Sequence, residues 1–185
     1  DKNMKILIVG GGGYVGTILT EFLLNKKIQV RCLDRFVYNN IDSIKSFSQN
    51  KNFELINGNY GDLKVINQSL RNITDVVFLG GLVGDPISKK YSKLSQKVNE
   101  IYIKNFIKIC SESKINKFIF TSTCSNYGMI QDNQLADEEF ELRPLSNYAK
   151  SKVEIEKYIL SLRDTNNFNP VILRFATAFG VSQRM

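Results

Sequence analysis

The segment "SNYAKSK" places Tyr148 four residues before Lys152, so on a helix the two side chains lie on one face. The chain contains no histidine, and any acid–base chemistry must therefore use Tyr, Lys, Asp, Glu or Cys. A free phenol titrates at about pH 10, and a neighbouring ammonium favours the phenolate and lowers that pKa. The spacing indicates a tyrosine base with a lysine that tunes it. The alternative is an ordinary surface helix that carries a tyrosine and a lysine.

The segment "VGGGGYVGTILTEFLLN" places a cluster of glycines between an apolar run and a segment with helical spacing. It can be read as Gly11-x-Gly13-x-x-Gly16 or as Gly10-x-x-Gly13-x-x-Gly16. The first glycines permit a tight turn, Gly13 lets a pyrophosphate approach the backbone, and Gly16 lets the helix pack closely on the strand. The pattern predicts a dinucleotide site at the start of this helix, and a flexible glycine loop is the alternative.

Asp34 ends the second apolar run, 18 residues after Gly16. A carboxylate at that place accepts hydrogen bonds from the ribose hydroxyls of NAD and would repel the 2′-phosphate of NADP. Arg35 follows directly and could soften that repulsion. The position predicts NAD as the cofactor, although Asp34 can also be read as an ordinary acid at a strand end.

Six short apolar runs alternate with longer segments of helical spacing. The runs are Lys5–Val9, Gln29–Leu33, Phe53–Ile56, Val76–Leu79, Phe118–Phe120 and Val171–Leu173. The first segment has a helical face of Val15, Leu19 and Leu23. The second has Leu94, Val98, Ile101, Asn105 and Ile109 on or near one face, with Tyr102 and Phe106 beside them. The third has Tyr148, Lys152, Ile155, Ile159 and Leu162. Short strands alternating with helices predict an α/β fold with a parallel sheet built from βαβ units.

The composition favours a single cytoplasmic domain over residues 1–185, of which 43% are hydrophobic. Three widely spaced cysteines form neither a disulfide framework nor a zinc pattern, and no metal site is expected.

No apolar run reaches the roughly 18–20 residues that span a bilayer, and the N-terminus lacks the layout of a signal peptide. The net charge of +7 is scattered along the chain, which makes nucleic-acid binding an unfavoured hypothesis.

Taken together, these motifs resemble those of the extended short-chain dehydrogenases/reductases, in particular the NAD-dependent epimerase/dehydratase family of nucleotide-sugar enzymes. The matching segments are the glycine turn, "GNYGDL", "FLGGLVGDP", the "VN" at Asn99, "STCSNYG" and "LRFATAFG". Two places depart from the family: Asn59 replaces an aspartate in "GNYGDL", and Phe78 replaces a histidine in "FLGGLVGDP".

The resemblance implies a Rossmann-type doubly wound parallel sheet with helices on both faces, and it implies catalytic roles. Thr123 would bind the reacting sugar oxygen, Tyr148 would remove its proton while a hydride passes to NAD, and Lys152 would hold the ribose and tune Tyr148. The cofactor-binding residues that it implies are Gly10, Gly13, Tyr14, Val15, Gly16, Asp34, Arg35, Asn59, Tyr60, Leu79, Gly80, Gly81, Asn99, Ser122, Tyr148 and Lys152.

Cys124 and Ser125 stand where 4,6-dehydratases of this family usually carry Asp-Glu as the acid and base for water loss. Neither side chain offers a carboxyl group, which favours an epimerase or simple dehydrogenase acting on a sugar hydroxyl, with C4 expected. With no histidine to activate its thiol, Cys124 is expected to be a small packing residue.

The length of the chain raises an alternative function. Family members are generally longer and bind substrate mostly through their C-terminal region, so this chain is expected to lack most of that region. The alternative to an enzyme is therefore a cofactor-bound scaffold or an RNA-binding protein of the same fold. The positive charge supports this alternative, whereas the complete set Thr123, Tyr148 and Lys152 opposes it.

The resemblance also implies a homodimer, formed by the helix before the fifth strand and the helix with the Tyr-Lys motif. An apolar excess on these two helices supports this expectation, and ordinary burial of the same residues against the sheet is the alternative. It comprises Ile101, Tyr102, Ile109, Tyr158 and Ile159.

Overall fold

A computed structural model describes residues 4–81, 97–131, 133–163, 165 and 168–182. These residues form a six-stranded, wholly parallel sheet in the order β3-β2-β1-β4-β5-β6. The strands are β1 (Lys5–Val9), β2 (Gln29–Asp34), β3 (Phe53–Asn57), β4 (Asp75–Phe78), β5 (Lys117–Thr123) and β6 (Pro170–Phe175). This is the strand order of the Rossmann-type doubly wound fold, which confirms the predicted fold class.

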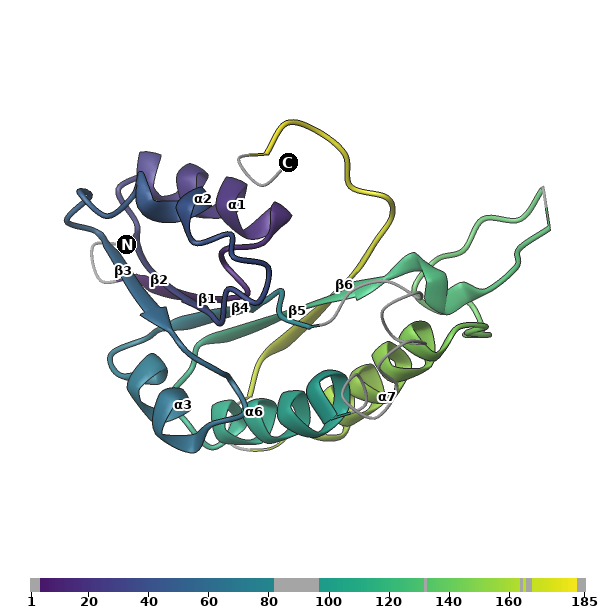
Figure 1. Ribbon diagram of the computed structural model, residues 1–185. Helices are drawn as coiled ribbons and strands as arrows, with labels where there is room; N and C mark the ends of the chain where they lie inside the picture. The colour runs from purple at the N-terminus through teal and green to yellow at the C-terminus, as the bar shows by residue number, and fades with distance from the viewer. Residues whose placement is uncertain (1–3, 82–96, 132, 164, 166–167, 183–185) are drawn as a thin grey trace.

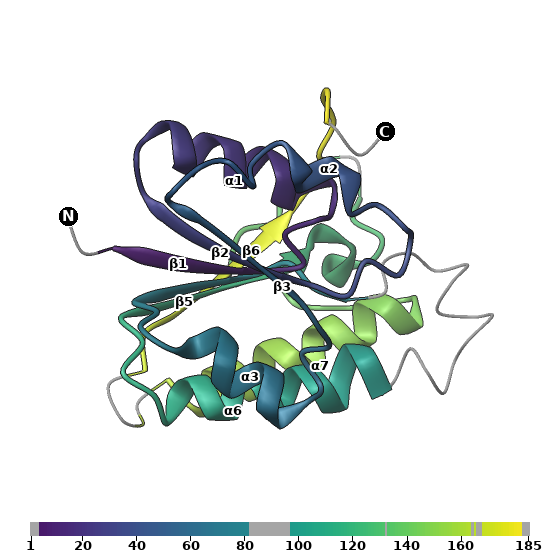
Figure 2. The same ribbon diagram turned by 60° about the vertical axis from the view of Figure 1, so that its left-hand side comes forward.

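Helices cover both faces of the sheet (Figures 1 and 2). On one face lie α1 (Tyr14–Asn25) and the short α2 (Asp42–Lys45). On the other face lie α3 (Leu63–Leu70), α6 (Tyr102–Ser111) and α7 (Asn147–Ser161). A π-helical turn, η1 (Lys97–Ile101), precedes α6, and a 3₁₀ turn, η2 (Cys124–Tyr127), follows β5. None of the described helices is long and apolar enough to cross a membrane.

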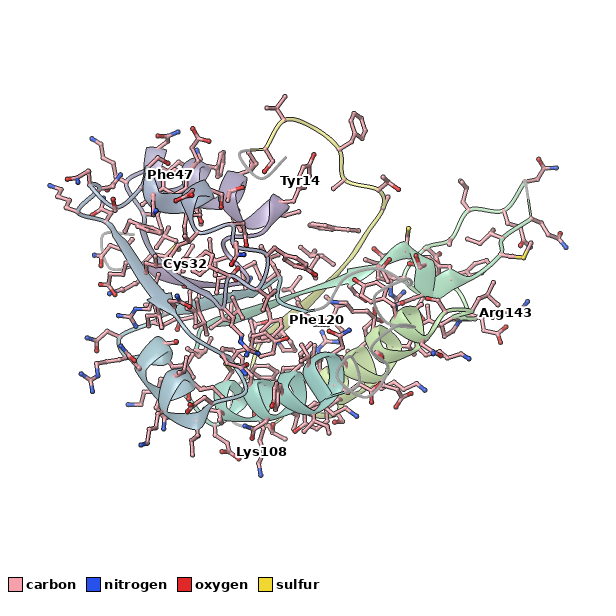
Figure 3. The ribbon with its side chains drawn as sticks, in the orientation of Figure 1. Tyr14, Cys32, Phe47, Lys108, Phe120 and Arg143 are labelled. Carbon is pink, nitrogen blue, oxygen red and sulfur yellow. The ribbon has the colours of Figure 1, made fainter. Side chains whose placement is uncertain are left out.

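The strand period of two divides the core into two layers. Leu7 and Val9 of β1 join the large cluster beneath α3, α6 and α7, whereas Ile6 and Ile8 pack with α1. Phe120 of β5 belongs to the large cluster and is fully buried, whereas the exposed Lys108 points outward from α6 (Figure 3). Strands that are buried on both faces explain why these runs are almost continuously apolar.

The predicted face of the helix before β5 is wrong in register. Ile101 is 60% exposed and Asn105 is also exposed, whereas Ile103, Phe106 and Ile107 are buried. The buried positions in η1 and α6 follow an α-helical count of their own, from Asn99 through Ile103 and Phe106 to Cys110, so the core-facing side is offset from the predicted one, and Val98 and Ile109 are only half-buried. Leu94, predicted on the same face, lies outside the described residues.

The sheet order brings the carboxyl ends of all six strands to one edge. The chain runs from β1 outward through β2 to β3 and then returns to β4 on the other side of β1. The crevice at such a reversal point is where open α/β sheets bind ligands. The polar connection between η2 and α7 begins near this edge and projects away from the body (Figure 1).

Candidate active site

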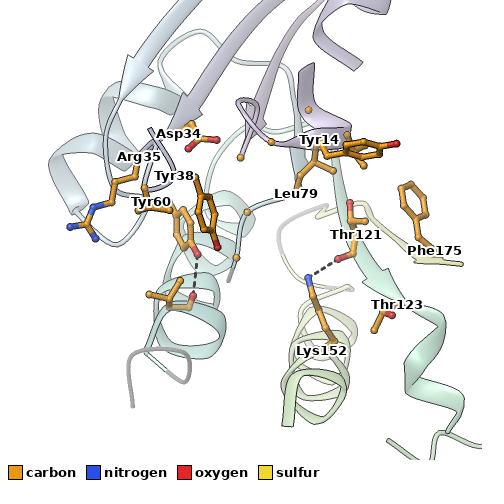
Figure 4. A pocket seen from close by; sticks show the side chains of 18 of the residues that line it. Tyr14, Asp34, Arg35, Tyr38, Tyr60, Leu79, Thr121, Thr123, Lys152 and Phe175 are labelled. Atoms are coloured by element: carbon orange, nitrogen blue, oxygen red, sulfur yellow. Dashed lines mark hydrogen bonds between the residues drawn. The ribbon is translucent and has the colours of Figure 1, made fainter. Parts of the chain in front are cut away.

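A pocket of about 680 Å³ opens at this edge of the sheet (Figure 4). Every sequence-predicted site residue except Asn99 lines it. Those residues are Gly10, Gly13, Tyr14, Val15, Gly16, Asp34, Arg35, Asn59, Tyr60, Leu79, Gly80, Gly81, Ser122, Thr123, Tyr148 and Lys152. Asn99 is buried beside the pocket wall, with its Oδ1 close to Gly81. The volume lies within the range of cofactor pockets, roughly 300–1,000 Å³.

The glycine turn leaves no room for side chains. Gly10 has φ +82°, and a Cβ there would lie 2.9 Å from the backbone nitrogen of Gly80 on the neighbouring β4 connection. A Cβ on Gly16 would lie 2.6 Å from the carbonyl oxygens of Gly10 and Gly11. The bare backbone therefore lets α1 begin directly against the end of β1.

The N-terminus of α1 has the features of an anion site. Its N-cap residue, Gly13, offers no side chain to the first-turn N–H groups, and the first turn contains no acidic residue. Gly10, Gly13 and Gly16 line the pocket and, because they have no side chain, expose their backbone to it. Free N–H groups and the helix dipole favour a phosphate at this place.

Asp34, at the end of β2, is held by two backbone N–H groups. Gly12 donates to its Oδ2 at 3.0 Å, and Phe36 donates to its Oδ1 at 2.8 Å. Each carboxylate oxygen keeps further acceptor capacity, and Asp34 lines the pocket. The carboxylate is thereby oriented to accept hydrogen bonds from a diol, while Arg35 beside it is exposed.

The wall beyond β3 is aromatic. Tyr60 donates a hydrogen bond from its hydroxyl to the carbonyl of Val98 at 3.2 Å and packs edge-on against Phe78, with ring centroids 5.3 Å apart. Burial, reinforced by the charge of Asp34, raises the pKa of Tyr60 above its usual range. The Oδ1 of Asn59 accepts from the N–H of Gly61 at 2.9 Å, which fixes this amide at the pocket wall. This end of the pocket therefore presents a flat apolar surface with one amide.

Lys152 lies at the opposite end of the pocket, on α7, and is only 8% exposed. Its ammonium donates to the carbonyl of Thr121 on β5 at 2.8 Å (Figure 4). The same nitrogen lies 4.5 Å from the ring centre of Phe120 and 5.7 Å from that of Tyr148. Burial lowers the pKa of Lys152 to about 8, although the negative charge of Glu156 acts in the opposite direction. The site thus holds a cation next to a phenol in a largely dry environment.

Thr123 ends β5 and caps the η2 turn. Its Oγ1 accepts the N–H of Ser125 at 3.2 Å, which leaves the hydroxyl proton available for donation into the pocket. Ser146 caps α7 in a similar way by accepting the N–H of Ala149 at 3.1 Å, so Tyr148 lies in the first turn of that helix. A hydroxyl from β5 and a phenol and an ammonium from α7 therefore line the same pocket.

Several pocket residues were not anticipated from the sequence. They are Val37, Tyr38, Asn40, Val98, Thr121, Phe175 and Ala176. Phe175 and Ala176 lie at the end of β6 and directly after it, and the "LRFATAFG" match could have indicated them. Cys124 does not pack in the interior as expected: it is exposed, because η2 turns away from the sheet immediately after Thr123. The described residues contain no group of three or more His, Cys, Asp or Glu that could hold a metal ion.

Comparison with known proteins gives matches that are named as epimerases or dehydratases of nucleotide sugars. In sequence, the chain is 32% identical over 189 residues to an uncharacterized UDP-glucose epimerase, YtcB, of Bacillus subtilis, and the match covers 98% of this chain and 58% of that protein. It is 27% identical to a dTDP-D-glucose 4,6-dehydratase of Dictyostelium discoideum, over 97% of this chain and 45% of that protein.

In structure, the chain superposes with a TM-score of 0.89 on the UDP-glucuronic acid 4-epimerase of Bacillus cereus, crystallised with UDP-glucuronic acid and NAD. The two are 28% identical, and the alignment covers 98% of this chain and 59% of that enzyme. The UDP-glucose 4-epimerase of Thermus thermophilus, crystallised with NAD, gives a TM-score of 0.81 at 25% identity over 92% of this chain and 54% of that enzyme.

The chain thus spans between about two fifths and three fifths of the length of these relatives. The family model described as "NAD dependent epimerase/dehydratase family" matches residues 6–185, which is nearly the whole chain. Together with the strand order and the glycine turn, this match establishes that the chain belongs to the NAD-dependent epimerase/dehydratase family.

Proposed function

We propose that this chain forms the cofactor-binding and catalytic part of an NAD-dependent enzyme that oxidises a hydroxyl of a nucleotide sugar. The observation that supports this most is that predicted cofactor residues and predicted catalytic residues line one pocket. The residues of the glycine turn and Asp34 line the same pocket as Thr123, Tyr148 and Lys152. A bound dinucleotide and a sugar hydroxyl can therefore both reach the phenol.

The residues present fit NAD. The glycine turn and the uncapped N-terminus of α1 would hold the pyrophosphate, because any Cβ at Gly10 or Gly16 would collide with backbone. Asp34 would accept the hydroxyls of one ribose, and the wall around Asn59 and Tyr60 would take the adenine. When bound, NAD supplies a hydride acceptor at its nicotinamide ring.

Tyr148 would act as the base that removes the proton from the sugar hydroxyl. Lys152 would hold the second ribose and favour the phenolate of Tyr148, because its ammonium lies on the same wall. Thr123 would donate its hydroxyl hydrogen to the reacting sugar oxygen and so orient it. We assign the reaction to C4, since the structural relatives from Bacillus cereus and Thermus thermophilus are named 4-epimerases.

The alternative of a cofactor-bound scaffold or RNA-binding protein is not favoured. The named relatives are epimerases and a dehydratase, and the three catalytic residue types are all retained at one pocket wall. We further propose that the enzyme is cytoplasmic, because its cysteines are free and two of them are buried.

The reaction type can be tested with a panel of nucleotide sugars. We expect the full-length protein with NAD to change the configuration or oxidation state of the sugar without loss of water, because Cys124 and Ser125 provide no carboxyl group. Mass spectrometry of the products would detect any loss of about 18 Da, the mass of one water. A dehydrated product would contradict this assignment, and the absence of both NAD binding and turnover would contradict the proposed function as a whole.

Cofactor preference depends on Asp34. Wild type should bind NAD more tightly than NADP, and Asp34→Asn should weaken NAD binding by about 1–3 kcal/mol because a charged acceptor is lost. The same substitution should raise NADP affinity relative to NAD. Calorimetric titration with both cofactors measures this, with Asp42→Asn on the exposed face of α2 as the control. Tighter binding of NADP by wild type would contradict this role of Asp34 and would indicate that Arg35 binds the 2′-phosphate of NADP.

We propose a homodimer through α6 and α7, although one of the residues expected in the interface is excluded. Ile159 is fully buried in the core, because it faces the sheet rather than solvent. Ile101, in the η1 turn just before α6, remains a candidate at 60% exposure, and the structure adds Leu160 of α7 at 51%. Light scattering at high micromolar concentration should give the mass of a dimer for wild type and a lower mass for Ile101→Glu. A monodisperse wild-type monomer would contradict the proposal.

A further inference from the structure

Glu156 is a buried charge that the proposed reaction does not use. It is 2% exposed and lies on α7 one turn after Lys152, on the side that faces the sheet. A carboxylate is stable at such a place only when several donors satisfy it, because transfer of an unpaired charge from water is very costly.

Three elements provide those donors. On β5 and the η2 turn, Ser122 donates its hydroxyl to Oε1, and Asn126 donates from Nδ2 to the same oxygen at 2.7 Å. On β6, Arg174 donates to Oε2 from Nη2 at 2.8 Å and from Nε at 3.1 Å. The amide of Asn126 also donates to the Ser122 hydroxyl at 3.0 Å, which closes the network. One carboxylate therefore ties α7 to the ends of two adjacent strands.

The residues that hydrogen-bond to Glu156 are close neighbours, along the chain, of the proposed catalytic residues and of the pocket residue Phe175. Thr123 lies between Ser122 and Asn126 in the chain, so its position depends on two residues that Glu156 holds. Lys152 lies on the same helix as Glu156, and Phe175, which lines the pocket, directly follows Arg174. A displacement of α7 relative to β5 would change the distance from Thr123 to Tyr148.

We propose that Glu156 is a positioning residue, which holds α7 in register with β5 and β6 and so keeps Thr123, Tyr148 and Lys152 in their reactive arrangement. This inference rests on the proposed function of those three residues. Glu156 itself lies outside the set of residues that line the pocket, so it acts through its neighbours.

Arg174 extends the network toward the surface. Its Nη1 donates to the hydroxyl of Tyr127 at 3.2 Å and to the carbonyl of Glu138 at 3.2 Å. The guanidinium also lies over the ring of Tyr127, 5.2 Å from its centre. Arg174 thereby also contacts the end of η2 and the middle of the projecting connection.

Glu156 has an electrostatic consequence for Lys152 as well. The groups that face the Lys152 ammonium are Tyr148 and Glu156 on α7 and the Thr121 carbonyl and Phe120 ring on β5, while Arg174 on β6 pairs with Glu156. Glu156 attracts the ammonium and so raises the pKa of Lys152, against the lowering by burial. Without this carboxylate the ammonium would lose its proton at lower pH.

Two substitutions in the full-length protein separate geometry from charge. Glu156→Gln removes the charge, and Glu156→Asp keeps the charge but withdraws the carboxylate from its donors. Glu154→Gln is the matched control, because Glu154 is exposed on the same helix and pairs only with Lys157 among the described residues. The measurements are kcat and KM for the sugar, the pH profile of kcat, NAD affinity and the thermal unfolding temperature.

For Glu156→Gln we expect kcat to fall about 10- to 100-fold with little change in KM, since misplaced catalytic groups lose rate rather than binding. The alkaline limb of its pH profile should move to lower pH, because the carboxylate that raises the pKa of Lys152 is removed. Glu156→Asp should lower kcat and leave the alkaline limb in place, and Glu154→Gln should match wild type. If Glu156→Gln does not fold, Glu156→Asp tests the inference instead: a lower kcat supports it, and a wild-type kcat overturns it.

A purely structural role predicts a different result. Both variants would then unfold at lower temperature but keep wild-type kcat and pH profile below that temperature, and this outcome would overturn the inference. If wild type binds NAD and turns over a sugar but Glu156→Asp is fully active, the inference alone fails. If wild type neither binds NAD nor turns over a sugar, the proposed function fails and the inference with it.

Discussion

Replacing Tyr148 by phenylalanine is expected to reduce turnover of the nucleotide sugar at least about a hundredfold, because a positioned acid–base group typically supplies 10²–10⁴ in rate. The substitution removes one oxygen and leaves the ring in the first turn of α7, where Ser146 caps the helix.

Affinity for NAD should change by less than about tenfold in this variant, since at most one neutral hydrogen bond to the cofactor is lost. Steady-state kinetics and calorimetric NAD titration measure the two effects separately. Tyr158→Phe is the matched control, because it removes a phenol oxygen from the same helix outside the pocket. Near-normal turnover by Tyr148→Phe would rule out this residue as the base.

Replacing Lys152 by methionine should damage both cofactor binding and turnover. Methionine nearly conserves the length of the buried stem, but the Thr121 carbonyl loses its donor and the phenol loses its neighbouring cation. Loss of a hydrogen bond from a charged group costs about 1.5–3 kcal/mol, so NAD affinity should fall about 10- to 100-fold. Turnover should fall further, because a phenolate at Tyr148 would lose its neighbouring cation.

The pH dependence provides a second measurement for this lysine. Burial lowers the pKa of Lys152 to about 8, so the wild-type ammonium loses its proton as the pH rises through that value. The difference in turnover between wild type and Lys152→Met should therefore be largest below about pH 8 and should become smaller above it. Lys150→Met, on the exposed side of α7, should behave as wild type at every pH. A constant difference across the pH range would contradict the role of the ammonium.

The strands and the cofactor turn were predictable from local patterns. The six apolar runs correspond to the six strands within a few residues. The inner strands need nearly continuous apolar sequence because they are buried on both faces, whereas the edge strands β3 and β6 are half-buried or exposed. The glycine turn was predictable because positions 10 and 16 admit no Cβ, and this backbone requirement selects glycine directly. The family resemblance then placed Thr123, Asp34 and the Tyr-Lys pair at one pocket, and all of them line it.

The register of α6 was not predictable from the same patterns. The sequence offered two overlapping helical patterns, one through Ile101 and Asn105 and one through Ile103, Phe106 and Cys110, and only packing on the sheet decides which one faces the core. The exposure of Cys124 was not predictable either, because it depends on the direction that η2 takes after Thr123.

The contacts that organise the catalytic wall were decided by tertiary structure. Lys152 bonds to Thr121, 31 residues earlier, and Glu156 bonds to Ser122 and to Arg174, which lie 34 residues before and 18 residues after it. Nothing in the local spacing of a glutamate on a helix distinguishes a solvated side chain from a buried one. The distinction arises only when α7 packs across β5 and β6, because desolvation then makes the carboxylate depend on the donors that those strands supply.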